Sequence, residues 1–112
     1  LAVAADGDDI VGTVQAGFAR KTNQPHRGDV MKLIVRRDMR GRGIARQLME
    51  RLEAECLKRD RWLMVLDTAT GSAAEAIYPR LGWQRVGVVP EYALYPDGDY
   101  CGTTFFYKRL GV

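Results

Sequence analysis

Residues 33–45 read LIVRRDMRGRGIA, and this stretch decides how the chain folds. It begins as an apolar run typical of a strand, passes through a loop with two glycines, Gly41 and Gly43, and continues into a segment of helical periodicity. A helix that starts directly after such a loop presents free backbone N–H groups and the positive end of its dipole. Glycines also let an anion approach the main chain closely. The stretch therefore predicts a phosphate-binding loop.

The seven residues 36–42, which lead into and form this loop, include four arginines: Arg36, Arg37, Arg40 and Arg42. A cation near a helix N-terminus opposes the helix dipole at a cost of roughly 0.3–1 kcal/mol. An anion that binds there would offset this cost, so the arginines favour a binding site. The alternative is that the arginines stay solvated and that the glycines serve only the turn.

The spacing of the glycines argues against two familiar nucleotide sites. A P-loop needs four residues between its glycines and then Gly-Lys-Ser/Thr, and the loop does not have this pattern. A dinucleotide fingerprint is a closer match, because Gly41-x-Gly43 follows a strand and Asp67 ends the next predicted strand. Its third glycine, however, falls on Arg46, and the chain is too short for a second nucleotide-binding half.

The segments on either side of the loop have clear periodicity. Before it, we expect an antiparallel hairpin of strands over 1–5 and 10–18, a solvated loop over 19–28 and a third strand over 29–35. After it, apolar residues recur every three or four positions over 44–58. This spacing predicts an amphipathic helix of about four turns.

A second strand–helix unit follows the amphipathic helix. A strand is expected over 61–67, and Ser72 and Glu75 then have the spacing of a capping box, which satisfies orphan amides at a helix start. The short helix that begins there should run to about Leu81. Pro79 removes one donor from its last turn.

Two more strands complete the predicted order. The first is expected over 84–89, ended by Pro90, and the second over 103–110. The fold class is therefore α+β, with a mixed central sheet and flanking helices in the order ββ-β-α-β-α-β-β. With 112 residues, of which 46% are hydrophobic, the chain has room for a single domain that spans residues 1–112.

Composition restricts the partners. Cys56 and Cys101 form no CxxC pair and the single histidine is His26, so the sequence predicts no metal site and no disulfide scaffold, and it is typical of a reducing, cytoplasmic protein. The longest apolar run, 62–66, is far shorter than the ~20 residues that cross a bilayer, so no membrane partner is expected. Lys and Arg exceed Asp and Glu by 17 to 14, which favours an anionic ligand.

Two motifs carry a family resemblance. Residues 40–45, RGRGIA, resemble the Q/R-x-x-G-x-G/A coenzyme A signature of the GNAT superfamily of acetyl-CoA-dependent N-acetyltransferases. Residues 74–83, AEAIYPRLGW, resemble the second motif of that superfamily at the expected distance downstream. The resemblance implies a GNAT-like mixed sheet. The usual N-terminal strand and helices of that fold are not expected here, because the sequence opens at the predicted hairpin.

Further stretches are similar to the tabtoxin-resistance group of these acetyltransferases. They include 29–35 (DVMKLIV), 66–72 (LDTATGS), Tyr78 and 95–98 (YPDG). In many superfamily members an asparagine at the start of the second helix touches the coenzyme. Here Gly71 and Ser72 hold that place, as in the tabtoxin-resistance group.

The resemblance implies that acetyl-CoA is the cosubstrate and that no metal takes part. Backbone amides of the glycine loop would receive the diphosphate, and main-chain groups of the preceding strand would pair with the pantetheine arm like an added strand. The residues expected to bind the cofactor are Leu33, Ile34, Val35, Arg40, Gly41, Arg42, Gly43, Ile44, Ala45 and Ser72.

Three residues are candidates for catalysis. By resemblance, Asp29 matches the carboxylate proposed as base in the tabtoxin-resistance group, Asp67 matches a second acidic position, and Tyr78 holds the place of the general acid. A base is useful because an alkyl ammonium of pKa ~10.4 is only about one part in a thousand neutral at pH 7. The alternatives stay open: Asp29 as an exposed strand residue, Asp67 as a turn residue and Tyr78 as a core tyrosine.

The sequence thus predicts an N-acetyltransferase that moves acetyl from acetyl-CoA to a primary amine of a small molecule, such as a toxin, an antibiotic or a metabolite, by direct attack. A non-catalytic acyl-CoA-binding module is the alternative. Nucleic-acid binding is disfavoured because the arginines are confined to one loop. A homodimer stays open.

Overall fold

The computed structural model describes residues 2–6, 9–18, 20 and 22–111, and the predicted order of strands and helices is confirmed. The chain divides into two compact units, one formed by the chain up to Met64 with the residues from Arg109 on, the other by Val65–Lys108. The elements are β1 (Ala2–Asp6), β2 (Asp9–Phe18), β3 (Arg27–Val35), a 3-10 turn η1 (Arg37–Met39), α1 (Ile44–Lys58), β4 (Leu63–Ala69), α2 (Ala73–Ile77), a 3-10 turn η2 (Tyr78–Leu81), β5 (Gln84–Leu94) and β6 (Tyr100–Arg109).

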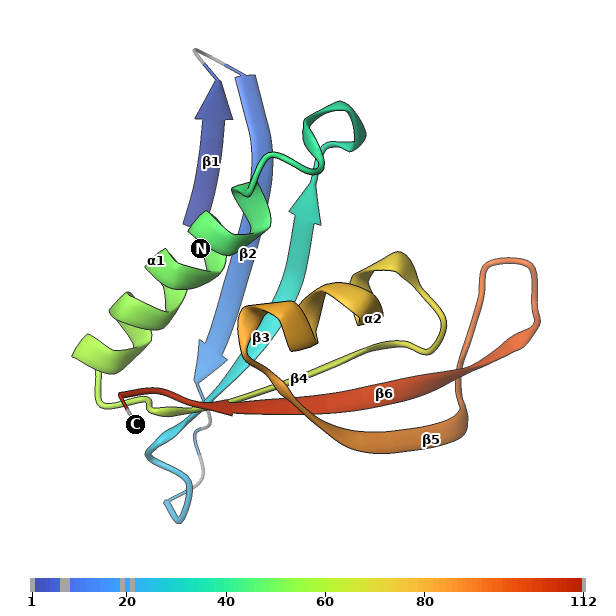
Figure 1. Ribbon diagram of the computed structural model, residues 1–112. Helices are drawn as coiled ribbons and strands as arrows, with labels where there is room; N and C mark the ends of the chain where they lie inside the picture. Colours follow the sequence, from blue (N-terminus) through green and yellow to red (C-terminus); the bar gives the residue numbers. More distant parts are fainter. Residues whose placement is uncertain (1, 7–8, 19, 21, 112) are drawn as a thin grey trace. The chain divides into compact units, whose positions relative to one another are not determined.

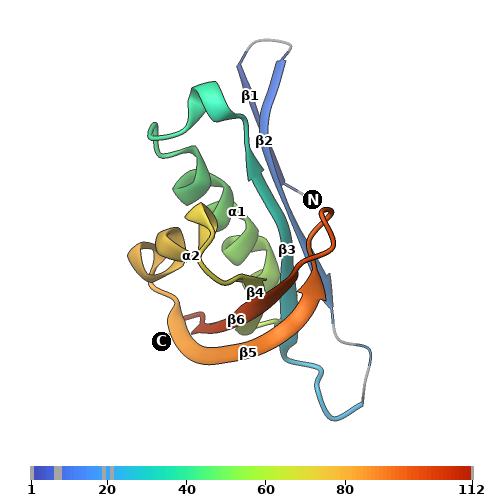
Figure 2. The ribbon, with the colours of Figure 1, turned by 90° about the vertical axis from the view of Figure 1, so that its right-hand side faces the viewer.

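In the first unit, α1 lies across an antiparallel sheet of β1, β2 and β3 (Figures 1 and 2). The helix has the bounds that the periodicity predicts, and it buries the apolar stripe Leu48, Met49, Leu52 and Cys56. The helix packs closely on the sheet at Gly12, where an added Cβ would lie 3.0 Å from Cδ1 of Leu48. A small residue at this position therefore sets the distance between helix and sheet.

Strand β3 contains a bulge just before the glycine loop. Two residues, Lys32 and Leu33, stand opposite the single residue Val14 of β2, and Lys32 has a φ of 54°. A non-glycine residue in this region costs about 1–2 kcal/mol. The bulge takes Leu33 out of the regular ladder with β2, in the segment expected to pair with pantetheine.

In the second unit, β6 lies between β4 and β5, and β5 and β6 are antiparallel. The predicted capping box is present at the start of α2, where Oγ of Ser72 accepts a hydrogen bond from the Glu75 amide at 3.3 Å. The helix changes to a 3-10 turn at Tyr78, because Pro79 cannot donate a backbone hydrogen bond, and it ends at Gly82 with a φ of 89°.

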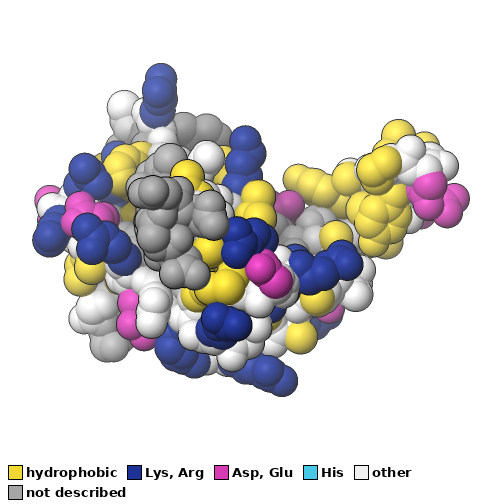
Figure 3. Space-filling model, turned by 90° about the horizontal axis from the view of Figure 1, so that it is seen from above, with side chains coloured by type: hydrophobic (Ala, Val, Ile, Leu, Met, Phe, Trp, Pro, Cys, Tyr) yellow, Lys and Arg dark blue, Asp and Glu magenta, His cyan; other side chains and the backbone are white. Residues whose placement is uncertain are grey.

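The expectation that Pro90 ends its strand is wrong. Strand β5 continues to Leu94, because the residues between Val89 and Ala93 form a bulge opposite β6 in which Glu91 has a φ of 54°. A proline is tolerated at a bulge, where its missing N–H interrupts no ladder bond. The resulting long β5–β6 hairpin carries exposed apolar side chains, including Tyr92, Leu94 and Tyr100 (Figure 3).

Among the described residues, no helix is both long enough and apolar enough to cross a bilayer.

Candidate active site

The glycine loop has the backbone conformation of an open cradle. Gly41 and Gly43 have φ values of 82° and 78°, a region that residues with a Cβ rarely adopt. An ideal Cβ at either position would meet nothing within 4 Å. Packing against the protein is therefore not what requires glycine here. The requirement comes from the backbone conformation, and the space above both residues is open to a ligand.

The N-terminus of α1 leaves its backbone donors available. Gly43 is the N-cap and provides no capping side chain, and the first turn holds no acidic residue. The first bond of the helix runs from the Gln47 amide to the Gly43 carbonyl at 3.1 Å. Within the part of the chain that the structure describes, the amides of Gly43, Ile44 and Ala45 donate to no protein group. Three adjacent N–H groups and the helix dipole thus converge where an anion would be stabilised.

The four arginines of the loop divide into two kinds. Nε and Nη2 of Arg36 donate to both carboxylate oxygens of Asp38 at 2.7 and 3.1 Å, and this contact holds the pKa of that carboxyl below its usual range. Nε of Arg40 donates to the carbonyl of Val35 at 3.2 Å. Arg36 and Arg40 therefore help to shape the loop. Arg37 and Arg42 are exposed, and Lys and Arg side chains are spread over this end of the unit (Figure 3).

Asp29 lies on β3 and carries an ion pair. Its Oδ1 is 3.3 Å from Nε of Arg27, two residues earlier on the same strand. The side chain as a whole is 44% exposed. One carboxylate oxygen is thus paired with a neighbouring guanidinium, while the side chain as a whole remains partly exposed.

Asp67 lies on β4, in the second unit, and is bonded to β6. The hydroxyl of Thr103 is 3.2 Å from Oδ2 of Asp67 and 3.0 Å from the carbonyl of Thr68, so its single proton is shared between the two acceptors. The Asp67 side chain is otherwise exposed. A carboxylate oxygen remains accessible to a cationic ligand.

Ser72 belongs to a hydrogen-bond network that joins the start of α2 to β6. Oε1 of Glu75 accepts from the Gly71 amide at 3.3 Å, and Oε2 of Glu75 accepts from the Thr104 hydroxyl. Because Thr104 donates to Glu75, it must accept from the Thr70 hydroxyl, 3.0 Å away. The Ser72 hydroxyl serves as the helix cap, so any contact with a coenzyme would be additional to that role.

We expect the Glu75 contacts to make the protein sensitive to acid. The bonds from Thr104 and Gly71 lower the pKa of Glu75, so their stabilisation is fully present above the usual glutamate pKa and is lost as pH falls through the lowered value in the folded state. A Glu75→Gln variant should have a lower melting temperature than wild type at pH 7. The two should converge in acid, which thermal denaturation from pH 7 to pH 2.5 would measure. A constant difference would contradict the proposed linkage.

Tyr78 occupies an aromatic cluster between η2 and β6. The ring is 6% exposed, and its centroid is 5.5 Å from that of Phe106 and 6.1 Å from that of Trp83. Burial raises the pKa of the phenol. Tyr78 therefore stays protonated at neutral pH and can donate a hydrogen bond. Within the described residues, no protein group accepts from it.

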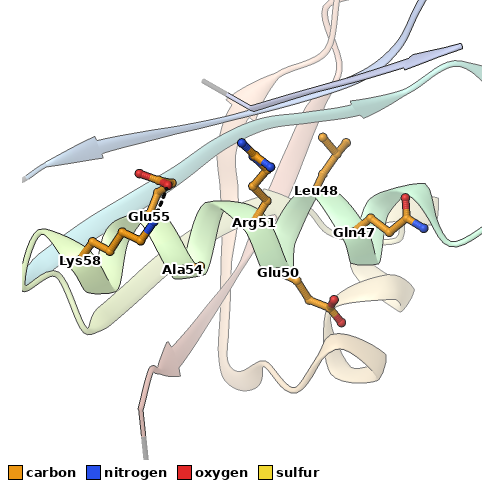
Figure 4. Close-up of a pocket in the computed structure, with 7 residues that line it drawn as sticks. All are labelled: Gln47, Leu48, Glu50, Arg51, Ala54, Glu55 and Lys58. Carbon is orange, nitrogen blue, oxygen red and sulfur yellow. Dashed lines mark hydrogen bonds and ion pairs between the residues drawn. The ribbon is translucent and has the colours of Figure 1, made fainter. Parts of the chain in front are cut away.

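One hollow lies away from these residues. A hollow of about 650 Å³ lies along α1 and is lined mainly by charged and polar side chains, among them Glu50, Arg51 and Lys58 (Figure 4). The figure shows the Glu55–Lys58 ion pair at one end of it. None of the predicted site residues lines this hollow. It is an open, charged helix surface that the predicted chemistry does not use.

Sequence reasoning missed Arg27, Thr103 and Thr104, which hold Asp29, Asp67 and Glu75 respectively. A signal existed only for Arg27, since opposite charges two residues apart on one strand lie on the same face. Across the described part of the chain, no group of three or more His, Cys, Asp or Glu side chains could hold a metal ion.

Solved structures of acetyltransferases share this fold. One is the ribosomal-protein-alanine N-acetyltransferase of Brucella melitensis, at 24% identity and a TM-score of 0.84, with 96% of this chain and 67% of that one covered. An acetyltransferase from Salmonella typhimurium, solved with acetyl-CoA, has 20% identity and a TM-score of 0.85 over 98% and 64% of the two chains. An aminoglycoside 6'-N-acetyltransferase complexed with coenzyme A has 20% identity and a TM-score of 0.78 over 96% and 70%.

These similarities confirm the predicted fold class, a mixed sheet with flanking helices. The chain spans 64% to 70% of the length of the three solved proteins. The family described as acetyltransferase (GNAT) domain matches residues 1–85, which include the glycine loop and the aromatic turn at Tyr78. The chain therefore belongs to the GNAT acetyltransferase family.

Proposed function

We propose that this protein is an acetyl-CoA-dependent N-acetyltransferase of the tabtoxin-resistance type that acetylates a primary amine of a small molecule. The observation that carries the proposal is the set of three unpaired amides at Gly43, Ile44 and Ala45, at the start of a helix without an acidic first turn. Such a site accepts a diphosphate without rearrangement. The similar proteins from Salmonella typhimurium and of the aminoglycoside type are described with acetyl-CoA and coenzyme A.

The residues of the loop fit this cofactor. The space above Gly41 and Gly43 is open, so phosphate oxygens can reach the main chain, and the exposed Arg42 adds a charge that favours them. The main chain of Leu33 and Val35 would pair with the amide groups of the pantetheine arm. The arrangement supports an extended ligand that lies along a strand and a loop, for which no deep cavity is needed.

Bound acetyl-CoA supplies an acetyl thioester, whose carbonyl carbon is the electrophile. An amine nitrogen of the acceptor forms the new C–N bond, the C–S bond breaks, and one N–H proton must leave the nitrogen. Asp29 is our candidate to bind the ammonium and take that proton, with Asp67 as the second carboxylate. Tyr78 stabilises the leaving thiolate by a hydrogen bond. A free phenol is already a weaker acid than a thiol, and burial raises the pKa of the Tyr78 phenol further, so full proton transfer is not needed.

The acceptor class follows from this chemistry. A carboxylate suits an ammonium, and the named substrates of two similar structures, a ribosomal protein alanine and an aminoglycoside, are also amines.

We place the reaction in the cytoplasm, because the two cysteines, Cys56 and Cys101, are both free thiols.

A binding and turnover experiment tests the proposal. Acetyl-CoA and acetyl-pantetheine, which lacks the diphosphate, would be titrated into the protein by calorimetry. Thiol release would then be followed with a panel of primary amines. We expect acetyl-CoA to bind much more tightly than acetyl-pantetheine, and at least one amine to release thiol. Binding without turnover on any amine would support the non-catalytic module instead, and no binding would refute both.

We expect Arg42→Gln to weaken acetyl-CoA binding about fivefold, the loss of ~1 kcal/mol from one exposed charge–phosphate contact. The effect should shrink as salt is raised, because exposed charges are screened. Arg59→Gln is a matched control, since Arg59 is an exposed arginine at the other end of α1, paired with Glu55 at 3.7 Å. Equal losses in both variants would show that only the net charge matters.

A further inference from the structure

The ion pair between Arg27 and Asp29 has two buried atoms that find no well-aligned partner. Nε of Arg27 and Oδ1 of Asp29 are both buried, lie 3.3 Å apart and form no other hydrogen bond within the described residues. Buried polar atoms are seldom left in this state without a reason. Among the contacts of the described residues, the ion pair with the other atom is what compensates each of them.

The backbone that carries this pair is fixed from both sides. Gly28 and Asp29 pair with Phe18 and Gly17 of β2. The carbonyl of His26 accepts from the amides of Trp62 and Leu63 at 3.0 and 3.1 Å, and Nη1 of Arg61 donates to the carbonyl of Arg27 at 3.1 Å. The segment has little freedom to move, so the orientation of the Asp29 carboxylate depends on its side-chain contact with Arg27.

The pair lies on the face of the sheet opposite α1. Val30 pairs with Ala16, which lines a hollow together with Leu52 and Cys56 of α1. Side chains alternate along a strand, so Arg27 and Asp29 point to the other face. Of the two carboxylate oxygens, Oδ1 is buried against Arg27, whereas Oδ2 is neither buried nor bonded to a described residue. One oxygen is held and the other is available.

We propose that Arg27 is a positioning residue that holds Oδ1 of Asp29 so that Oδ2 can accept a hydrogen bond from an unhindered primary alkylammonium. The proposal rests on the proposed function and adds the device that orients the acceptor. Without Arg27, the carboxylate can rotate and the buried Oδ1 loses the charge that the ion pair provides. The acceptor affinity should then fall, while the cofactor affinity should not.

An NMR titration tests this without requiring turnover. Propylammonium chloride would be added to the full chain with coenzyme A, and the amide shifts of Gly28 and Asp29 would be followed. We expect saturable shifts in wild type, none in Asp29→Asn, and an apparent Kd raised about fivefold in Arg27→Gln, as for a lost charge-assisted contact. Arg27→Lys should stay within about twofold of wild type, because one donor suffices for a single contact. Absence of shifts in wild type would overturn the proposal.

A double-mutant cycle separates positioning from a merely structural role. With the best acceptor of the amine panel, Arg27→Gln should raise the KM for that amine when Asp29 is present. In the Asp29→Asn background, the same substitution should not change this KM. Additive effects, or a change in coenzyme A affinity equal to the change in KM, would show a structural role. Arg59→Gln again serves as the control. Failure of the proposed function looks different, since acetyl-CoA would then either not bind or bind without thiol release on any amine.

Discussion

Replacement of Tyr78 by Phe should lower kcat by about two orders of magnitude, the usual scale for a positioned acid–base group, and leave acetyl-CoA binding intact. Phenylalanine keeps the ring contacts with Phe106 and Trp83, at 5.5 and 6.1 Å between centroids, and removes only the hydroxyl. The leaving thiolate then loses its hydrogen-bond donor. Steady-state rates of thiol release, together with calorimetric binding, measure the two quantities separately.

The pH dependence gives a second readout for Tyr78. Burial raises the pKa of its phenol, so the donor is present at all pH values up to the normal tyrosine range and is lost only above it. The rate of the wild-type protein should therefore not fall on the alkaline side below about pH 10. Tyr92→Phe is a matched control, because its ring contacts Phe105 at 5.8 Å and its side chain is 54% exposed. Full activity in Tyr78→Phe would show that Tyr78 serves only to pack the core and takes no part in catalysis.

Elements with strong local signals could be predicted to within a few residues. The α1 stripe repeats every three or four positions over four turns, and nothing in it competes with the helical pattern, so Ile44–Lys58 is found as predicted. The Ser72–Glu75 box is equally local, because both partners lie within one turn. The end of β5 could not be predicted, since whether Pro90 terminates a strand depends on a bulge against β6.

In the candidate site, too, features with a local sequence signal could be predicted, whereas features that depend on distant contacts could not. The glycine loop is readable because its chemistry lies within consecutive residues. The predicted strand at Asp29 begins two residues too late, since β3 starts at Arg27, and this hid the ion pair. Thr103 and Thr104 lie 36 and 29 residues from their partners Asp67 and Glu75, and nothing in a single sequence shows that these segments are neighbours. The residues that contact and orient the site carboxylates were therefore missed, whereas the residues that belong to a recognisable sequence motif were found.

Replacement of Gly43 by Ala should weaken acetyl-CoA binding by about 100-fold, or ~2.7 kcal/mol. The residue has a φ of 78°, and alanine in this region costs about 1–2 kcal/mol. A chain that relaxes toward negative φ turns the Gly43 amide away from its neighbours at Ile44 and Ala45. If the chain does not relax, the added methyl occupies the open space where the phosphates would lie.

The control variant Gly98→Ala separates the loss of acetyl-CoA binding from the backbone strain that alanine causes at a positive φ. Gly98 has a φ of 93°, and a Cβ there also meets nothing within 4 Å, so the conformational cost should be similar. It lies at the tip of the β5–β6 hairpin, outside the predicted site. Both variants should lose a similar amount of thermal stability without ligand, and only Gly43→Ala should fail to gain stability when acetyl-CoA is added. If both were stabilised equally by acetyl-CoA, the amides at the start of α1 would not be the diphosphate site.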